Sequence, residues 1–399
     1  MRDVHIVFWS YNWGKQPTKD RVALINALPE GITLLATFEM GEILENEGVL
    51  VRSADYSLSF EGPGFYFRTE AEAAKARGIR MYSMTNSGGR TWDFGCAPYE
   101  PMADSWIRRY DAMKYAHDEW NLSGIMECHH YGFYPSIIYK RSNYAFMLPE
   151  EPYEEILAKI LKAEYGEENL ETVDAALRDF REAINFYTAT NSDQYGALRV
   201  GPAHPLNVVQ SIKIPADPDS MFGNRIWYPK YLVNNNGHWM STVSPLAIRI
   251  REEAKSFAKM QELMEKGIAT LKQAPAPNGK LSRLAGLAQF ITNSVKTAIA
   301  AKEMHLLDGE LQFTPDINRQ EEILNEMEAL LRKERKNAED TIPLVEADSA
   351  LGYEPSMHYL CEKEHLEWKL RHTDYVLSIE LSELRSAVEV HKAFIAQQK

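Results

Sequence analysis

Polar and aromatic side chains gather where one apolar stretch of the sequence ends. Residues 123–126 are followed directly by Glu127, Cys128, His129, His130 and Tyr131. Successive strand residues point to opposite sides, so we expect Glu127 and His129 to share one face and Cys128 and His130 the other. Carboxylates and imidazoles facing a cavity can transfer protons or bind a cation. In a second interpretation, these groups only satisfy one another and nearby backbone.

Two other apolar runs end in the same way. Glu39 closes the run of residues 32–38, where a buried carboxylate is costly without a partner or a ligand. Residues 87–92 (SGGRTW) follow another run and form a loop that presents Arg and Trp. Flat rings beside hydrogen-bonding groups are what sugars require. The predicted site comprises the candidate catalytic carboxylates Glu39 and Glu127 and the candidate substrate-binding residues Tyr11, Trp13, Asn86, Arg90, Trp92, His129 and Tyr131.

A turn far along the chain carries two more acids. Residues 345–359 (VEADSALGYEPSMHY) interrupt a helical pattern and contain Asp348 and Glu354. Acids around a Gly-containing turn often serve only as caps. The alternative is that both reach back to the strand ends, and we include them as candidate substrate-binding residues.

The spacing of these residues does not predict a metal site. The chain has no His-x-x-x-His pattern and no Asp-rich loop. We therefore expect no metal and no cofactor, while a metal-dependent hydrolase using Glu127, His129 and His130 stays an alternative.

Strands alternate with helices over the first part of the chain. Strands are predicted at 4–11, 32–39, 79–86 and 123–126, with helices after Pro17, at 68–78 and at 103–120. Residues 49–60 follow Glu39 too closely for a crossover helix and are predicted to be an inserted extended segment or hairpin. Repeated β/α units predict parallel strands whose carboxyl ends open onto one face, as in a (β/α)8 (TIM) barrel. Four units make half a barrel.

Apolar residues recur at helical spacing after residue 150. The predicted fold class is therefore α/β followed by all-α, with 1–150 forming a partial barrel and 151–399 a helical domain. The helical segments are expected near 152–166, 170–187, 244–271, 281–307, 318–335 and 362–396.

Composition limits the class of protein. The 399 residues are 45% hydrophobic and carry a formal net charge of −13, which disfavours nucleic acid as a partner. No apolar run long enough to cross a membrane and no leader pattern occurs, so the chain as written is expected to be cytoplasmic, or secreted or periplasmic if residues precede it. Three distant cysteines indicate reduced thiols.

Three segments, SGIMECHHYGFYPS, GPAHPLNVV and PLVEADSALGYEPSMHY, occur in an order that resembles bacterial proteins similar to glycoside hydrolase family 20, the hexosaminidases. The resemblance covers most of the chain and implies a barrel, a helical C-terminal domain and N-acetylhexosamine-containing glycans. It also implies an adjacent Asp-Glu catalytic pair after the fourth barrel strand, which no residue here matches. His129 stands where relatives often carry a Trp.

The leading hypothesis is a glycoside hydrolase-like protein that acts on or binds carbohydrate through Glu39 and Glu127. A second hypothesis is a noncatalytic carbohydrate-binding or assembly subunit, because an open half barrel leaves two sheet edges unpaired. Such a chain completes its barrel with another copy or a partner chain.

Overall fold

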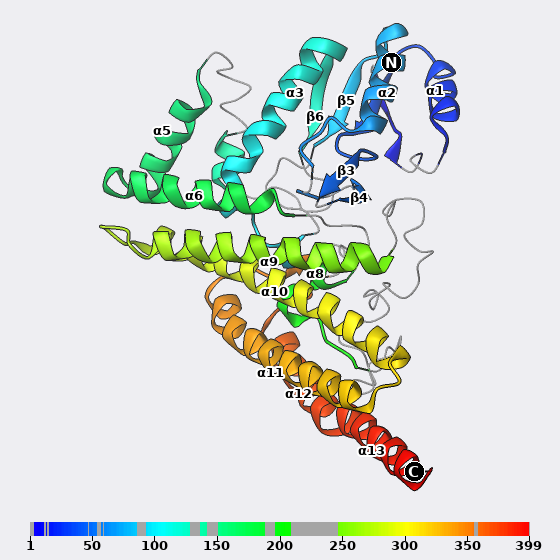
Figure 1. Cartoon of the computed structure of the whole chain (residues 1–399). Coiled ribbons are helices and arrows are strands. Elements are labelled where there is room, and N and C mark those ends of the chain that lie inside the picture. Colours follow the sequence, from blue (N-terminus) through cyan, green and yellow to red (C-terminus); the bar gives the residue numbers. More distant parts are fainter. Residues whose placement is uncertain are drawn as a thin grey trace.

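The computed structural model describes residues 4–11, 13, 16–46, 48–53, 57–58, 60–85, 93–127, 136–141, 151–187, 196–208, 246–354 and 358–398. The molecule is elongated (Figure 1). A small sheet and its helices form one end, two long helices cross the middle, and the C-terminal helices form the other end.

Four parallel strands form the central sheet. They are β1 (Ile6–Trp9), β2 (Ile32–Thr37), β5 (Met81–Met84) and β6 (Leu122–Met126), and they lie side by side in chain order. The four predicted strands are thus confirmed; β1, β2 and β5 are shorter than predicted, and β6 begins one residue earlier than predicted. Within the described residues the sheet is open, with β1 and β6 at its edges.

Three helices connect these strands: α1 (Thr18–Asn26), α2 (Phe65–Ala76) and α3 (Trp106–Trp120). Helix α2 contacts both α1 and α3, so the three helices lie on the same face of the sheet. Phe38 at the end of β2 meets Phe67 of α2 edge to face at 5.0 Å between ring centroids, and Phe67 meets Trp120 of α3 at 5.9 Å. Aromatic packing therefore holds the helical layer on the sheet.

Two short hairpins complete the β structure. Strands β3 (Ile43–Asn46) and β4 (Val49–Arg52) pair antiparallel, which confirms a hairpin after Glu39 but begins it six residues earlier than the predicted segment at 49–60. Gly48 adopts φ 78°, a conformation that favours glycine. Strands β7 (Tyr353–Glu354) and β8 (His358–Tyr359) form the second hairpin.

The rest of the described chain is mainly helical, as predicted. Short 3₁₀ segments η2 (Phe94–Cys96) and η3 (Glu100–Ser105) precede α3, and residues 137–141 form a short helix. The later helices are α5 (Tyr153–Tyr165), η4 (Glu167–Asn169), α6 (Leu170–Ile184), α8 (Ala197–Val200), η5 (Gly201–Ala203), α9 (Leu246–Leu271), α10 (Gly279–Phe313), α11 (Ile317–Ala347), α12 (Lys363–Tyr375), the π-helical η8 (Val376–Glu380) and α13 (Leu381–Gln398). An α/β part followed by a helical part is therefore the observed fold class.

Helix α10 lies at the centre of the helical part. It contacts α9 and α11 along its length, and it also contacts η2, η3, α8 and η5. The side chain of Asn278 caps its N-terminus by accepting hydrogen bonds from the backbone N–H groups of Lys280 and Leu281. Phe290 of α10 lies so close to Gly95 that a Cβ there would come within 2.8 Å of its ring. A glycine in η2 thus allows α10 to approach the segment that follows β5.

Charged groups are buried between the helices. Lys302 of α10 donates to Glu253 of α9 at 2.7 Å, and Lys369 of α12 contacts Glu334 of α11; all four side chains are at most 3% exposed. Such pairs are costly to break singly, because the remaining charge has no partner.

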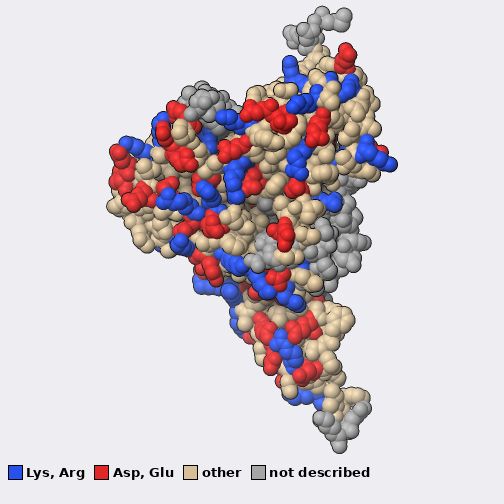
Figure 2. Space-filling view, turned by 45° about the horizontal axis from the view of Figure 1, so that its top comes forward, with Lys and Arg blue, Asp and Glu red and all other residues tan. Residues whose placement is uncertain are grey.

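None of the described helices has the length and apolar character needed to cross a membrane. Cys361 is a buried free thiol, in agreement with the predicted reduced state. Acidic and basic side chains are interspersed over the face shown in Figure 2.

Candidate functional site

The carboxyl ends of the four strands meet at one edge of the sheet. Ser10 N donates to Leu35 O at 3.0 Å, Phe38 N to Met84 O at 3.2 Å, and Thr85 N to Met126 O at 3.2 Å. These bonds continue the parallel ladder just past each strand. Glu39 and Glu127, one residue beyond Phe38 and Met126, therefore end strands that are separated only by β5.

Strand alternation places Glu39 and Glu127 on opposite faces of the sheet. Leu34, Ala36 and Phe38 belong to the core beneath α2, so the residues between them face the opposite way. The register between β5 and β6 shifts between Met81 and Tyr82, after which Ser83 pairs with Ile125 and Met84 with Met126. Glu127 therefore has the parity of Ile125, which packs against that core, and alternation turns Glu127 toward the helices. Strand spacing puts the two backbone positions about 10 Å apart.

Arg109 of α3 holds Glu39 in place. Both side chains are at most 2% exposed, and Arg109 Nη1 lies 3.6 Å from Glu39 Oε1. The same guanidinium donates to three backbone carbonyls, those of Thr85 at 2.6 Å, Ser57 at 3.1 Å and Phe60 at 2.8 Å. A single Arg thus ties the end of β5 and the chain before α2 to the carboxylate that ends β2.

The backbone at Glu39 is also fixed. Ser53 Oγ donates to Glu39 O at 2.6 Å, and a Cβ at Gly64 would come within 2.7 Å of that carbonyl oxygen. Glu127, by contrast, is only partly buried. Of the two predicted carboxylates, Glu127 is the one that solvent and a ligand reach more easily.

Two aromatic residues predicted for the site follow β1. The Tyr11 ring stacks on Trp9 with centroids 4.8 Å apart, and Trp13 packs against Phe8 at 4.9 Å. Both residues are partly buried and lie at the carboxyl edge of the sheet.

Five other predicted site residues lie outside the described part of the chain. They are Asn86, Arg90, Trp92, His129 and Tyr131. The same holds for Cys128 and His130. Their predicted division between two faces stays a prediction. In the part of the chain that the structure describes, no group of three or more His, Cys, Asp or Glu side chains is arranged to hold a metal ion.

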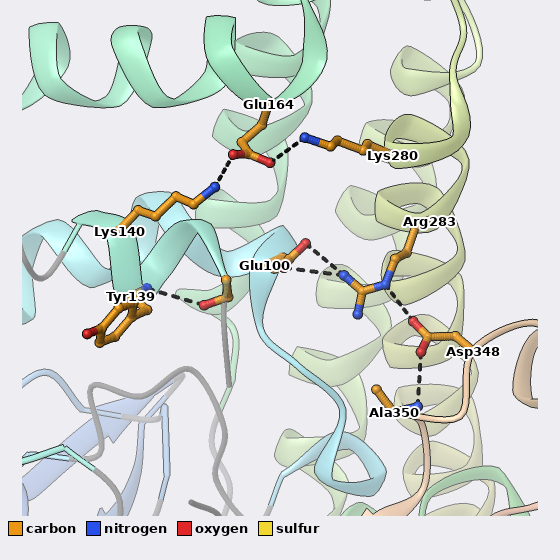
Figure 3. A network of polar contacts seen from close by, with 9 residues as sticks. Glu100, Tyr139, Lys140, Glu164, Lys280, Arg283, Asp348 and Ala350 are labelled. Atoms are coloured by element: carbon orange, nitrogen blue, oxygen red, sulfur yellow. Dashed lines mark hydrogen bonds and ion pairs between the residues drawn. The ribbon is translucent and has the colours of Figure 1, made fainter. Parts of the chain in front are cut away.

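Asp348 takes part in a network far from Glu39 in sequence (Figure 3). Arg283 of α10 donates through Nε to Asp348 Oδ2 at 2.8 Å and lies with Nη1 3.4 Å from both oxygens of Glu100 in η3. Ala350 N donates to Asp348 Oδ1 at 2.9 Å, as the capping interpretation predicts. Glu354 belongs to β7, and its side chain lies outside the described part of the structure.

The acids of this network differ in their surroundings. Burial raises the pKa of Glu100, and the attraction of Arg283 only partly opposes this effect. Glu164 of α5 is more exposed; burial disfavours its ionised form, but hydrogen bonds from Lys140 and Lys280 outweigh that effect and lower its pKa. The network joins η3, α5, α10 and the turn after α11, and its contacts are structural.

Comparison with known proteins finds similarity among solved structures. No protein-family model and no curated protein matches the chain. Among solved structures, a GH138 enzyme targeting pectin rhamnogalacturonan II superposes with a TM-score of 0.54 at 11% sequence identity. The match covers 98% of this chain and 57% of that enzyme, so the chain spans less than two thirds of its length. The likeness establishes a shared fold, and it gives no support to the family 20 resemblance.

Sequence reasoning missed several buried polar residues around the strand ends. Arg109 has the spacing of Trp106 and Met113 on the buried face of α3, and an Arg on an apolar stripe is a signal for a buried partner. Glu70 of α2 is another: it accepts from Ser10 Oγ at 2.5 Å and Arg21 Nη1 at 2.7 Å, and burial raises its pKa. Of Arg109 and Glu70, only Arg109 contacts a predicted catalytic residue, Glu39.

Proposed function

We propose that this protein acts on or binds carbohydrate at the carboxyl edge of its sheet. The observation that carries the proposal is the likeness to a glycan-degrading GH138 enzyme over 98% of the chain. The family 20 resemblance has no support from this comparison, so the proposal names glycans in general and leaves N-acetylhexosamines as one class to test.

Glu127 and Glu39 are the proposed catalytic carboxylates. Glycoside hydrolysis uses two carboxyl groups on either side of the scissile bond, one as acid and one as base or nucleophile. Glu127 is partly exposed at the end of β6 and suits the residue that exchanges protons with the glycosidic oxygen. Glu39 is completely buried and held by Arg109, which suits a fixed second carboxylate. Tyr11 and Trp13 supply ring faces at the same edge.

We further propose that residues 1–150 form half of a (β/α)8 barrel and that residues 151–399 form the helical domain. The described strands follow one another in chain order, and the connecting helices lie on one face of the sheet. A barrel segment has this arrangement, whereas a doubly wound sheet has helices on both faces. The unpaired edge strand β1 exposes Ile6 and Val7, which are 54% and 44% exposed. Parallel strands from a second copy or a partner chain would cover this edge.

The experiment is an activity and binding assay on the whole chain. The substrates are pectic oligosaccharides and a panel of aryl glycosides that includes N-acetylhexosaminides. We expect Glu127→Gln and Glu39→Gln to reduce turnover by about 10² to 10⁴, the usual contribution of general acid–base catalysis. Glu72→Gln is the control, because Glu72 is an exposed glutamate of α2. Turnover that survives both active-site substitutions would refute the assignment of these carboxylates.

A noncatalytic carbohydrate-binding subunit is the second candidate. The open sheet and the 57% coverage of the GH138 enzyme favour it. It predicts glycan binding without turnover, together with self-association or partner binding detected by light scattering. Absence of both binding and turnover with every glycan tested would remove both candidates.

A further inference from the structure

A groove lined by polar and apolar side chains runs between α9, α10 and α11, on the helical part of the molecule. It encloses about 550 Å³. This volume falls within the usual range for small-molecule sites, about 300 to 1,000 Å³. Its lining includes the side-chain amides of Gln261, Gln289, Asn293 and Asn337. We call it the α9–α11 groove.

The floor of the groove is a preorganised set of amides. Asn293 Nδ2 donates to Thr341 Oγ1 at 2.9 Å, while its Oδ1 accepts from Gln289 Nε2 at 2.9 Å. Asn337 Nδ2 donates to Asn293 O at 3.0 Å and to Thr297 Oγ1 at 3.1 Å. Both asparagines are at most 9% exposed, so their orientations are fixed by the protein.

The fixed amides leave hydrogen-bonding capacity for a ligand. Among the described residues, no donor contacts Asn337 Oδ1, although the Nδ2 atom of the same side chain is fully used. Glu334 also lines the groove, and its negative charge is neutralised by an ion pair with Lys369. The floor is therefore polar without carrying an uncompensated charge.

The rim carries three lysines, of which two form close ion pairs in the described part of the chain. Lys296 pairs with Glu265 at 2.9 Å, and Lys336 pairs with Asp340 one turn along α11. Lys333 is exposed, and its charge attracts the carboxylates of Glu265 and Glu303, but it forms no hydrogen bond or close ion pair with another described residue. Its ammonium is thus the cation available to a ligand in this groove.

The acids of the lining limit what that ligand is. Glu303 and Asp340 line the groove together with the lysines, and the chain carries a net charge of −13. A phosphate or a nucleic acid would place several negative charges beside these carboxylates. Hydroxyl groups can both donate to carboxylates and amide oxygens and accept from an ammonium. A polyhydroxylated ligand with a single negative charge therefore fits the amides, carboxylates and lysines that line the groove.

We propose that the α9–α11 groove binds a uronate, a sugar unit that carries one carboxylate. Its carboxylate meets Lys333, and its hydroxyls meet Asn337 Oδ1 and the Gln289 side chain. The groove then acts as an accessory binding site that holds an acidic glycan on the helical part of the molecule. This inference deepens the proposed function and rests on it for the choice of carbohydrate.

The test is ligand-observed NMR and calorimetric titration of the full chain with galacturonate, with galactose as the probe that lacks the carboxylate. We expect binding of galacturonate with a dissociation constant of about 1 mM, and weaker binding of galactose. Lys333→Gln should weaken galacturonate binding about tenfold, as expected for loss of one charge-assisted hydrogen bond, and should abolish the preference over galactose. Lys114→Gln, a change at an exposed lysine of α3, is the matched control and should leave binding unchanged.

Two outcomes would overturn the inference. One is no binding of galacturonate to the wild-type chain, and the other is equal binding to wild type and Lys333→Gln with circular dichroism showing both to be folded. The Glu127→Gln variant separates this result from the proposed function, because it should lose turnover and keep uronate binding in the groove. Turnover of neutral glycans without uronate binding would leave the proposed function standing and remove the groove site.

Discussion

His204, which follows η5, should make the protein lose stability in mild acid. Burial disfavours the charged ring and the like charge of Lys369 adds to this, so the pKa of His204 falls from its ordinary 6.5 to about 3. Between these values the unfolded chain binds a proton that the folded chain does not. Stability from this group is therefore complete above pH 6.5 and is lost as the pH falls toward 3.

The size of the effect follows from the shift. Each pH unit below 6.5 costs about 1.4 kcal/mol, so the free energy of unfolding should be about 2 kcal/mol lower at pH 5 than at pH 7 through this group alone. The full loss below pH 3 is about 5 kcal/mol.

The assay is urea unfolding followed by circular dichroism between pH 4 and 8, comparing wild type with His204→Gln. Replacing the ring with an uncharged amide removes its titration, so the variant's stability should fall less steeply with acid, whatever its stability at pH 7. His391→Gln is the control because His391 is exposed on α13. Parallel stability curves for wild type and His204→Gln would refute the argument.

Three further predictions concern packing and charge. Lys369→Met should lower the free energy of unfolding by about 3 kcal/mol because it leaves Glu334 buried without its cation, and adding Glu334→Leu should restore most of the loss in a double-mutant cycle. Glu100→Gln should stabilise the protein at pH 7, because the raised pKa of Glu100 shows that the folded state disfavours the ionised carboxylate. The wild type gains stability as the pH falls through this raised pKa, so the advantage of the variant should disappear in acid. Urea unfolding at several pH values measures the difference. Gly267→Ala should cost about 1–3 kcal/mol in thermal unfolding because the new Cβ would come within 2.4 Å of the Phe180 ring, whereas Gly309→Ala, with open space around it, should be neutral or stabilising.

Local patterns were sufficient to predict the elements. The apolar runs that became β2 and β6, and the helical spacing of residues 318–335 within α11, depend on contacts that recur every two or every three to four residues. The predicted hairpin began later than the observed one because Ile43–Asn46 contains two polar residues and has no clear strand pattern in sequence. Its strand conformation depends on pairing with Val49–Arg52. Element type was thus readable, and strand ends were not.

The partners of the polar side chains were beyond local reasoning. Glu39 was identified as a carboxylate that needs a partner, but Arg109 lies 70 residues away in sequence and could only be found in three dimensions. The contact between Glu100 and Arg283 spans 183 residues. The α9–α11 groove is assembled from three helices whose facing amides look, in sequence, like ordinary exposed positions.

The unbroken course of α10 limits how the chain can vary in length. Arg283 contacts the segment beside the sheet, and Asn293 forms the groove floor ten residues later on the same helix, a rise of about 15 Å. Inserting one residue between them would turn every later side chain by about 100°, which would separate the amides from α11 while leaving Arg283 in place. Insertions and deletions should therefore be tolerated in the turn at 274–278 and rejected within 283–293. A library of single-residue insertions, screened for soluble protein, would display this boundary directly.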